Sequence, residues 1–114
     1  MLHSLLLIVA IWLLSGCTDS TPLSVENRSG VPLQSVVVSG SGFSQVLGSI
    51  EPGATVKSHI RPSGESGISI SFVASGKRVA LPADGYFEAG GRYSVTVVVT
   101  PRLGASVDSQ LQPY

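Results

Sequence analysis

Signals for chain reversal recur about every eight to twelve residues in this sequence, and the segments between them alternate apolar and polar side chains. The clearest run is Tyr93 to Thr100, which places a tyrosine and three valines on one face; serine and threonine occupy the other, and Val98 alone breaks the alternation. A second run, Ile68 to Ala74, places apolar side chains inward and serines outward. This period of two is typical of half-buried β-strands, and no helical period competes with it.

Shorter candidate strands complete the set: Leu23 to Arg28, Gln34 to Ser39, Phe43 to Ile50, Ala54 to Ile60, Lys77 to Leu81, and a weak closing strand at Ala105 to Asp108. Turn residues separate them at 28–32, 40–42, 51–53, 62–67, 75–77, 83–85 and 89–91. Seven or eight short strands without a covering helix must bury their apolar faces against one another. We therefore predict an all-β fold: an antiparallel two-sheet sandwich, or as the less economical solution a small barrel.

One stretch resembles the immunoglobulin and fibronectin type III superfamily. Glu88-Ala-Gly-Gly-Arg-Tyr-Ser-Val-Thr-Val is similar to the start of the penultimate strand in that superfamily, where a tyrosine hydroxyl bonds back to the preceding corner. The resemblance implies that Tyr93 is this corner tyrosine; the alternative is an inward aromatic at the start of a strand. The Cys-Trp-Cys core signature is absent, so the resemblance is one of architecture.

The first sixteen residues contain no Asp, Glu, Lys or Arg, and only His3 and Ser4 interrupt the apolar run from Leu2 to Leu14. As a helix of about fourteen residues, this run would reach about 21 Å, short of the roughly 30 Å hydrocarbon thickness of a bilayer. Its length suits the hydrophobic region of a signal peptide, which small residues should follow. We therefore expect an N-terminal signal helix.

The small residues follow as Leu14-Ser15-Gly16-Cys17, which resembles the lipobox of bacterial lipoproteins. The resemblance implies that a diacylglycerol is attached to the Cys17 sulfur, that a peptidase then cuts before Cys17, and that an amide-linked third chain usually follows. The alternatives are an ordinary secretory peptide with a chance cysteine, or a buried apolar segment. Because the single cysteine stands where the apolar run gives way to polar sequence, the lipoprotein reading is favoured. No Lys or Arg precedes the run, which departs from the family's pattern.

Lipidation at Cys17 predicts both where the protein is located in the cell and how its chain divides into segments. Two or three acyl chains hold a protein on a membrane essentially permanently. In enteric-type sorting, an Asp directly after the lipidated cysteine favours the inner membrane; here Thr18 takes that place, so the outer membrane facing the periplasm is favoured over the inner membrane. The expected division is 1–16 signal peptide, 17–22 lipidated cysteine and linker, 23–110 β-sandwich domain and 111–114 C-terminal tail.

Composition excludes several classes of function. Seven basic and seven acidic residues give zero net charge, which removes the attraction that dominates nucleic-acid binding. One cysteine and two histidines leave too few ligands for structural zinc and most transition-metal sites, and one cysteine forms no internal disulfide. We expect no nucleic-acid partner, no metal and no cofactor.

No catalytic set stands out in the sequence. Gly64-Glu-Ser-Gly67 lacks the strand-to-helix setting of a nucleophile elbow, and a serine hydrolase built on Ser66 would have to use His59 as its base. The glycine-rich stretch 38–43 precedes a strand, whereas phosphate-binding loops precede a helix, so a hairpin is expected there. The carboxylates are scattered among turns with no paired spacing. We therefore expect a protein that is not an enzyme.

Two surfaces are candidate partner contacts. Within Thr55 to Arg61, strand alternation places Lys57, His59 and Arg61 on one face, about 7 Å apart. Such a stripe suits anionic lipid headgroups, lipopolysaccharide phosphates or an acidic protein, or else it is a solvated face whose charges discourage edge pairing. Tyr86 and Phe87 are adjacent, so in a strand one would be core and the other exposed, unless both pack under a loop.

These features favour a lipid-anchored cell-envelope protein whose β-sandwich is a non-catalytic binding or structural module. The membrane, reached through the acyl chains on Cys17, and an unidentified envelope protein are the expected partners. The alternative is an inhibitor or accessory factor of an extracytoplasmic hydrolase that inserts a loop such as Pro62 to Gly67 into an active site.

Overall fold

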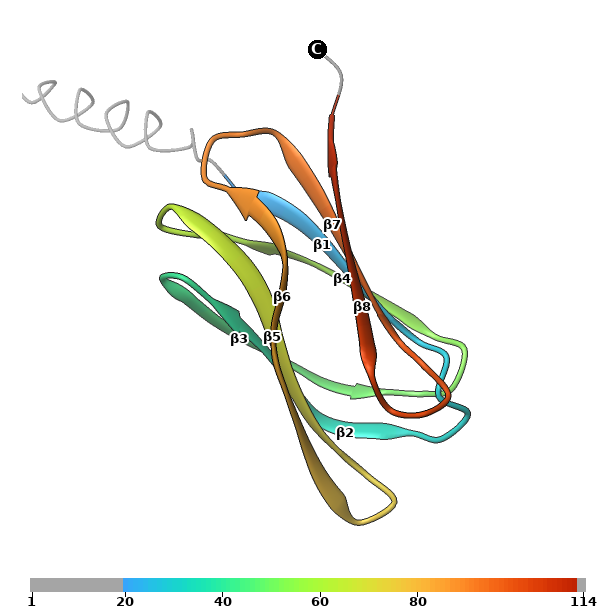
Figure 1. Cartoon of the computed structure of the whole chain (residues 1–114). Coiled ribbons are helices and arrows are strands. Elements are labelled where there is room, and N and C mark those ends of the chain that lie inside the picture. The colour runs from blue at the N-terminus through green and yellow to red at the C-terminus, as the bar shows by residue number, and fades with distance from the viewer. Residues whose placement is uncertain (1–19, 113–114) are drawn as a thin grey trace, which may run out of the picture.

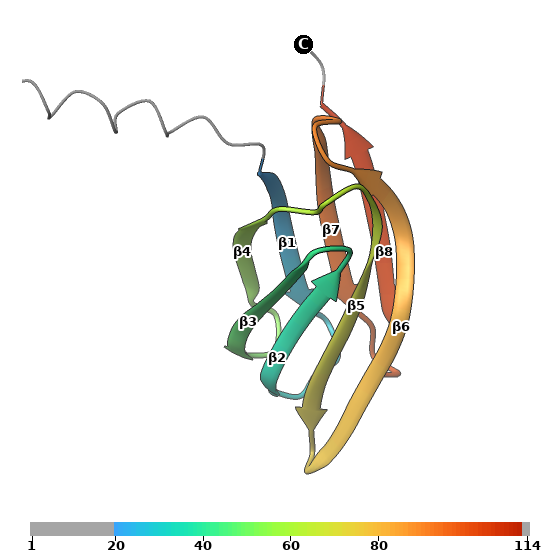
Figure 2. The same cartoon turned by 90° about the vertical axis from the view of Figure 1, so that its left-hand side faces the viewer.

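The chain folds into two four-stranded sheets packed face to face, as Figures 1 and 2 show. A computed structural model describes residues 20–112. The strands are β1 (Thr21–Asn27), β2 (Leu33–Gly40), β3 (Phe43–Ile50), β4 (Thr55–Ile60), β5 (Glu65–Ala74), β6 (Lys77–Glu88), β7 (Tyr93–Val99) and β8 (Ala105–Leu111). Sheet A has the order β4-β1-β7-β8 and sheet B the order β3-β2-β5-β6. The predicted all-β two-sheet sandwich is confirmed. In the described range, no helix has the length and hydropathy needed to cross a membrane.

The core lies between the sheets and follows the predicted alternation. In β7, Val95, Val97 and Val99 are buried, whereas Val98 faces outward and is only partly covered. In β5, every second residue from Ser66 to Ala74 is buried. The other buried apolar side chains are Leu23, Val25, Leu33, Val36, Val38, Ile50, Ile60 and Phe87. Burying one such aliphatic or aromatic side chain stabilises the fold by about 1.5 to 3 kcal/mol.

One strand pair departs from antiparallel pairing. β1 and β7 are parallel, with Val25 level with Val97, whereas β1 pairs antiparallel with β4 and β7 with β8. Alternation reports which face of a strand is buried but not its direction. Parallel neighbours require a long crossover, and here the chain from β2 to β6 provides it by passing through sheet B and the β4 edge.

β6 is longer than the sequence predicted, and the turn expected at Ala83 to Gly85 is wrong. The register between β5 and β6 shifts at this point, so the segment is an irregularity within a twelve-residue strand. Gly85 has a φ of 80°, and a Cβ on Gly67 of β5 would lie only 2.8 Å from the Asp84 carbonyl oxygen. Residues that suit a turn also suit a bulge, which explains the error.

The sandwich also extends slightly beyond its predicted ends. β1 begins at Thr21 and β8 ends at Leu111, so the strands of the sandwich start two residues earlier than 23 and include a residue assigned to the tail. Thr21 is 5% exposed and pairs with Ile60 of β4. The chain between Cys17 and the first strand is therefore shorter than the expected linker.

Asn27 holds together the loops at the opposite end of β1. Its side chain is fully buried; its Nδ2 donates hydrogen bonds to the carbonyl oxygens of Val31 (2.8 Å) and Ile50 (2.9 Å), and its Oδ1 accepts from the Ser29 amide and hydroxyl. This Asx-type turn satisfies the amide completely. It joins the β1–β2 loop to the end of β3.

Candidate functional site

The predicted basic stripe (Lys57, His59 and Arg61) lies on the outer side of sheet A. Lys57 and His59 are exposed on β4, an edge strand, and Arg61 is exposed directly after it. The intervening Ser58 faces inward, where its hydroxyl accepts a 2.6 Å hydrogen bond from Gln45 Nε2 of β3. This bond joins the neighbouring edges of the two sheets. The three side chains are thus presented together on one face, as alternation predicts.

The aromatic pair is divided between the core and the surface. The Phe87 side chain is fully buried and packs on Phe43, with ring centroids 6.4 Å apart. Phe87 therefore has no surface to offer a partner, and its assignment as a contact residue is corrected to core. Tyr86 is 49% exposed and remains a candidate partner-contact residue.

Tyr86 belongs to a small cluster with Glu88 and Tyr93. Its hydroxyl donates a 3.0 Å hydrogen bond to Glu88 Oε2, and its ring meets Tyr93 edge-on at 6.4 Å between centroids. The bond to the Glu88 carboxylate is the main cause that raises the pKa of Tyr86 to about 12. The hydroxyl therefore stays protonated as a hydrogen-bond donor well beyond neutral pH. The predicted corner role of Tyr93 stays a prediction.

Ser66 and His59 are not brought together as a nucleophile and a base. The Ser66 hydroxyl is buried in sheet B, where it accepts from the Ser41 amide at 3.0 Å and donates to the Gly67 carbonyl at 2.8 Å. His59 lies on the outer face of sheet A. The hydrogen bonds of Ser66 therefore hold the β2–β3 turn against β5.

The segment 62–67 is not a protruding loop. Residues 65–67 belong to β5, Pro62 is buried, and the Ser63 amide donates to the Ser41 carbonyl at 2.9 Å. The segment is thus a short connection that leads into β5, with Ser63 and Glu65 exposed. The inhibitor alternative stays a prediction.

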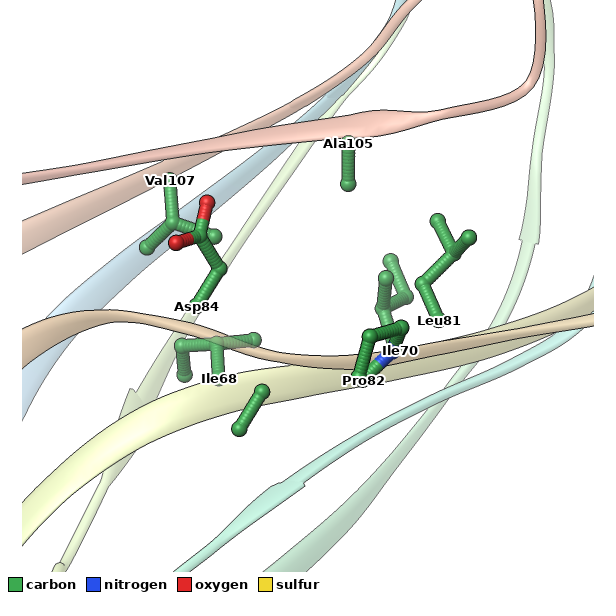
Figure 3. A pocket seen from close by; sticks show the side chains of 8 residues that line it. Ile68, Ile70, Leu81, Pro82, Asp84, Ala105 and Val107 are labelled. Carbon is green, nitrogen blue, oxygen red and sulfur yellow. The ribbon is translucent and has the colours of Figure 1, made fainter.

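A cleft that the sequence did not reveal opens between β6 and β8, where the two sheet edges approach each other (Figure 3). Its volume is about 250 Å³. The lining is apolar apart from one carboxylate, and consists of Ile68, Ile70, Leu81, Pro82, Ala83, Asp84, Ala105 and Val107. Figure 3 shows the Asp84 side chain extending from β6 toward Val107 of β8. Only the approach of strands remote in the sequence creates this cleft, so no local pattern could have predicted it.

The cleft suits a small apolar group, and Asp84 would attract a positive charge beside it. Within residues 20–112, no three histidine, cysteine or carboxylate side chains come close enough to share a metal ion. Cys17, the predicted lipidation site, lies outside the described residues.

Comparison with known proteins identifies the architecture and nothing finer. The fold is similar to that of a protein from Eubacterium rectale determined by NMR, with a TM-score of 0.54 and 11% sequence identity over 83% of this chain and 92% of that one. At this identity the likeness shows a shared fold alone. No family model matches the chain, and no curated protein matches it in sequence.

Proposed function

We propose that this chain is a lipid-anchored protein of the cell envelope whose β-sandwich serves as a non-catalytic binding module. The observation that carries the proposal is the junction at Cys17. An apolar leader and the residues Leu14 to Gly16 precede the cysteine and complete the lipobox-like motif with it, and β1 begins at Thr21, the fourth residue after Cys17. A folded domain therefore starts almost immediately after the expected anchor.

Metabolic labelling with an alkyne analogue of palmitate tests the anchor. The wild-type protein should take up label and remain with membranes, and Cys17→Ser should do neither. The matched control is Cys17→Ser combined with Ser75→Cys, which moves the only thiol to an exposed turn of the sandwich. Equal labelling of this control and the wild type would contradict the proposal, since acylation would then not depend on the leader motif.

Sorting to the outer membrane is the second part of the proposal, supported by Thr18 at the position after Cys17. Density-gradient separation of the two membranes should place the wild-type protein in the outer fraction. Thr18→Asp should move it toward the inner fraction. Co-migration of both proteins with the inner membrane would contradict this assignment.

The cleft between β6 and β8 is the surface that best supports a binding role, because it offers an apolar hollow with one charge. Ala83→Arg would place a long side chain at the cleft. Ala80→Arg is the matched control, since Ala80 is also exposed on β6 but pairs with Ser71 away from the lining. In affinity capture from detergent-solubilised membranes, a partner of the cleft should be lost with Ala83→Arg and kept with Ala80→Arg. Loss with both variants or with neither would exclude the cleft as the binding surface.

A further inference from the structure

The strands of sheet A end together on the side of the molecule where β1 begins. Thr21 pairs with Ile60, Tyr93 pairs with Leu111, and the parallel register of Leu23 with Val95 makes Thr21 level with Tyr93. These four residues, Ile60, Thr21, Tyr93 and Leu111, form one row across the sheet, called here the end row. Figures 1 and 2 show the start of β1, the β6–β7 loop and the end of β8 at this same end.

Two exposed apolar side chains lie in or beside the end row, whose members Thr21 and Ile60 are themselves buried. Three large apolar side chains of the described chain are markedly exposed: Val46 (75%), Leu111 (66%) and Tyr86 (49%). Leu111 belongs to the end row, and the Tyr86 ring contacts that of Tyr93. Two of the three therefore lie at the end where the chain enters the sandwich.

The guanidinium of Arg61 and the imidazole of His59 border the same end. Arg61 follows Ile60 directly and is exposed, and the exposed His59 pairs with Pro22 of β1. Two carboxylates also occur at this end, Glu65 and Glu88, which face each other across β5 and β6. They belong to sheet B, as does Tyr86, whose hydroxyl donates to Glu88. Positive charge at this end therefore lies on the sheet A side, at Arg61, and negative charge lies beside Tyr86.

The covalent chain limits how far this end can be from Cys17. Four residues span at most about 14 Å, whatever their conformation. A diacylglycerol on the Cys17 sulfur would hold that residue at the boundary between hydrocarbon and headgroups, and the polar region on each side of a bilayer is about 5 to 8 Å thick. The end row is therefore confined to the immediate neighbourhood of the headgroups.

We infer that the exposed part of this end, which is Leu111 of the end row together with Tyr86 and Arg61, rests on the lipid headgroups of the membrane that holds Cys17. This inference rests on the proposed lipid anchor. Moving tyrosine and leucine side chains into the interfacial region lowers the free energy. There the aromatic ring contacts apolar chains while its hydroxyl stays in contact with water. The guanidinium of Arg61 binds lipid phosphate while its methylenes cover apolar surface. The strands of sheet A then rise away from the membrane.

The orientation can be tested with a unique thiol. Once Cys17 is acylated, an introduced cysteine is the only free thiol of the chain. Gln112→Cys, next to the end row, and Ser106→Cys, near the far end of β8, are both exposed and stand about 20 Å apart along the strand. Each lipidated protein is coupled to a fluorophore and reconstituted into phosphatidylcholine–phosphatidylglycerol vesicles that contain a nitroxide-labelled headgroup. Quenching should be several-fold stronger at position 112 than at position 106.

Surface variants then identify the contacts. Leu111→Ser with Arg61→Gln should reduce quenching at position 112 several-fold. The matched pair Val46→Ser with Arg78→Gln, which changes an exposed valine and an exposed arginine away from the end row, should leave it unchanged. Equal quenching at positions 112 and 106 in vesicle-bound protein would overturn the inference while the anchor stands. Failure of the protein to stay on the vesicles at all would instead contradict the proposed lipidation.

Discussion

Replacing Asn27 with alanine should remove a large part of the stability of the sandwich. The side chain is fully buried and makes four hydrogen bonds: two from Nδ2 to the carbonyls of Val31 and Ile50, and two to Oδ1 from Ser29. Alanine has neither group. The bond to Ile50 lies in the buried interior, whereas the others are partly buried.

The magnitude follows from what each partner loses. A buried carbonyl deprived of its donor costs about 1 to 3 kcal/mol, and each partly buried bond contributes about 0.5 to 1.5 kcal/mol. The Val31 carbonyl keeps a 3.1 Å bond from the Ser29 hydroxyl, which lowers its share. We expect Asn27→Ala to lower the free energy of unfolding by about 4 kcal/mol. Since domains of this size are stable by about 5 to 15 kcal/mol, a substantial unfolded fraction would appear at low denaturant.

Urea unfolding followed by far-ultraviolet circular dichroism measures the effect. The matched control is Gln45→Ala, which removes another amide but breaks a single bond to a side-chain hydroxyl, Ser58 Oγ. This control should cost about 1 kcal/mol. Equal losses for the two variants would refute the reasoning, because the orphaned backbone groups at Asn27 would then carry no penalty.

The pH dependence of the stability of Asn27→Asp provides a second test of the buried site. A carboxylate would face two carbonyl oxygens in a buried site, so both desolvation and repulsion would raise its pKa in the folded state above the ordinary value of about 4. The loss in free energy of unfolding relative to the wild type should therefore be smallest below that ordinary pKa. It should grow as the pH rises through the raised folded-state pKa. A deficit independent of pH would contradict this account.

Three further changes test the core, the bulge and the aromatic cluster. Phe87→Ala should lower the free energy of unfolding by about 3 to 5 kcal/mol because a fully buried ring leaves a cavity, whereas Tyr86→Ala should lower it far less, because only an exposed hydrogen bond and a surface ring contact are lost; equal losses in urea unfolding would contradict the division between core and surface. Gly85→Ala should destabilise more than Gly76→Ala, because both have positive φ but a Cβ at 85 would also lie 2.5 Å from a valine methyl carbon of β8, and thermal unfolding would show the difference. Glu88→Gln should lower the pKa of Tyr86 from about 12 toward 10 by removing its carboxylate acceptor, as an ultraviolet titration of tyrosinate would show. The raised pKa of Tyr86 also means that this bond adds stability below about pH 10 and loses it as the pH passes about 12.

Local pattern predicted the strands well because burial and alternation are recorded in neighbouring residues. The predicted bounds Phe43 to Ile50 agree with β3, and Tyr93 to Thr100 differs from β7 by one residue. The same information predicted that the basic stripe would share one face. Tyr86 and Phe87 were expected on opposite faces if they lay in a strand, and they do.

What the sequence did not predict depends on residues far apart along the chain. Asp84-Gly85 suits a turn or a bulge equally, and only the pairing of β6 with β5 decides between them. The direction of β1 relative to β7 follows from the path through sheet B. Asn27 carried a local signal, since asparagine with Ser29 and Gly30 two and three residues later favours an Asx turn. Its buried hydrogen bond, however, depends on the Ile50 carbonyl from another strand.

The position of the cleft decides what kind of occupant it could take under the proposed orientation. Val107, which lines the cleft, is level with Val97 of β7 and hence with Val25 of β1. Val25 is four residues beyond Thr21, so the cleft lies about 13 Å along the strands from the end row. That height exceeds the thickness of the headgroup layer, about 5 to 8 Å. Lipids of the supporting membrane would therefore not reach the cleft while the end row rests on their headgroups, and its occupant would be a molecule that extends into the aqueous space.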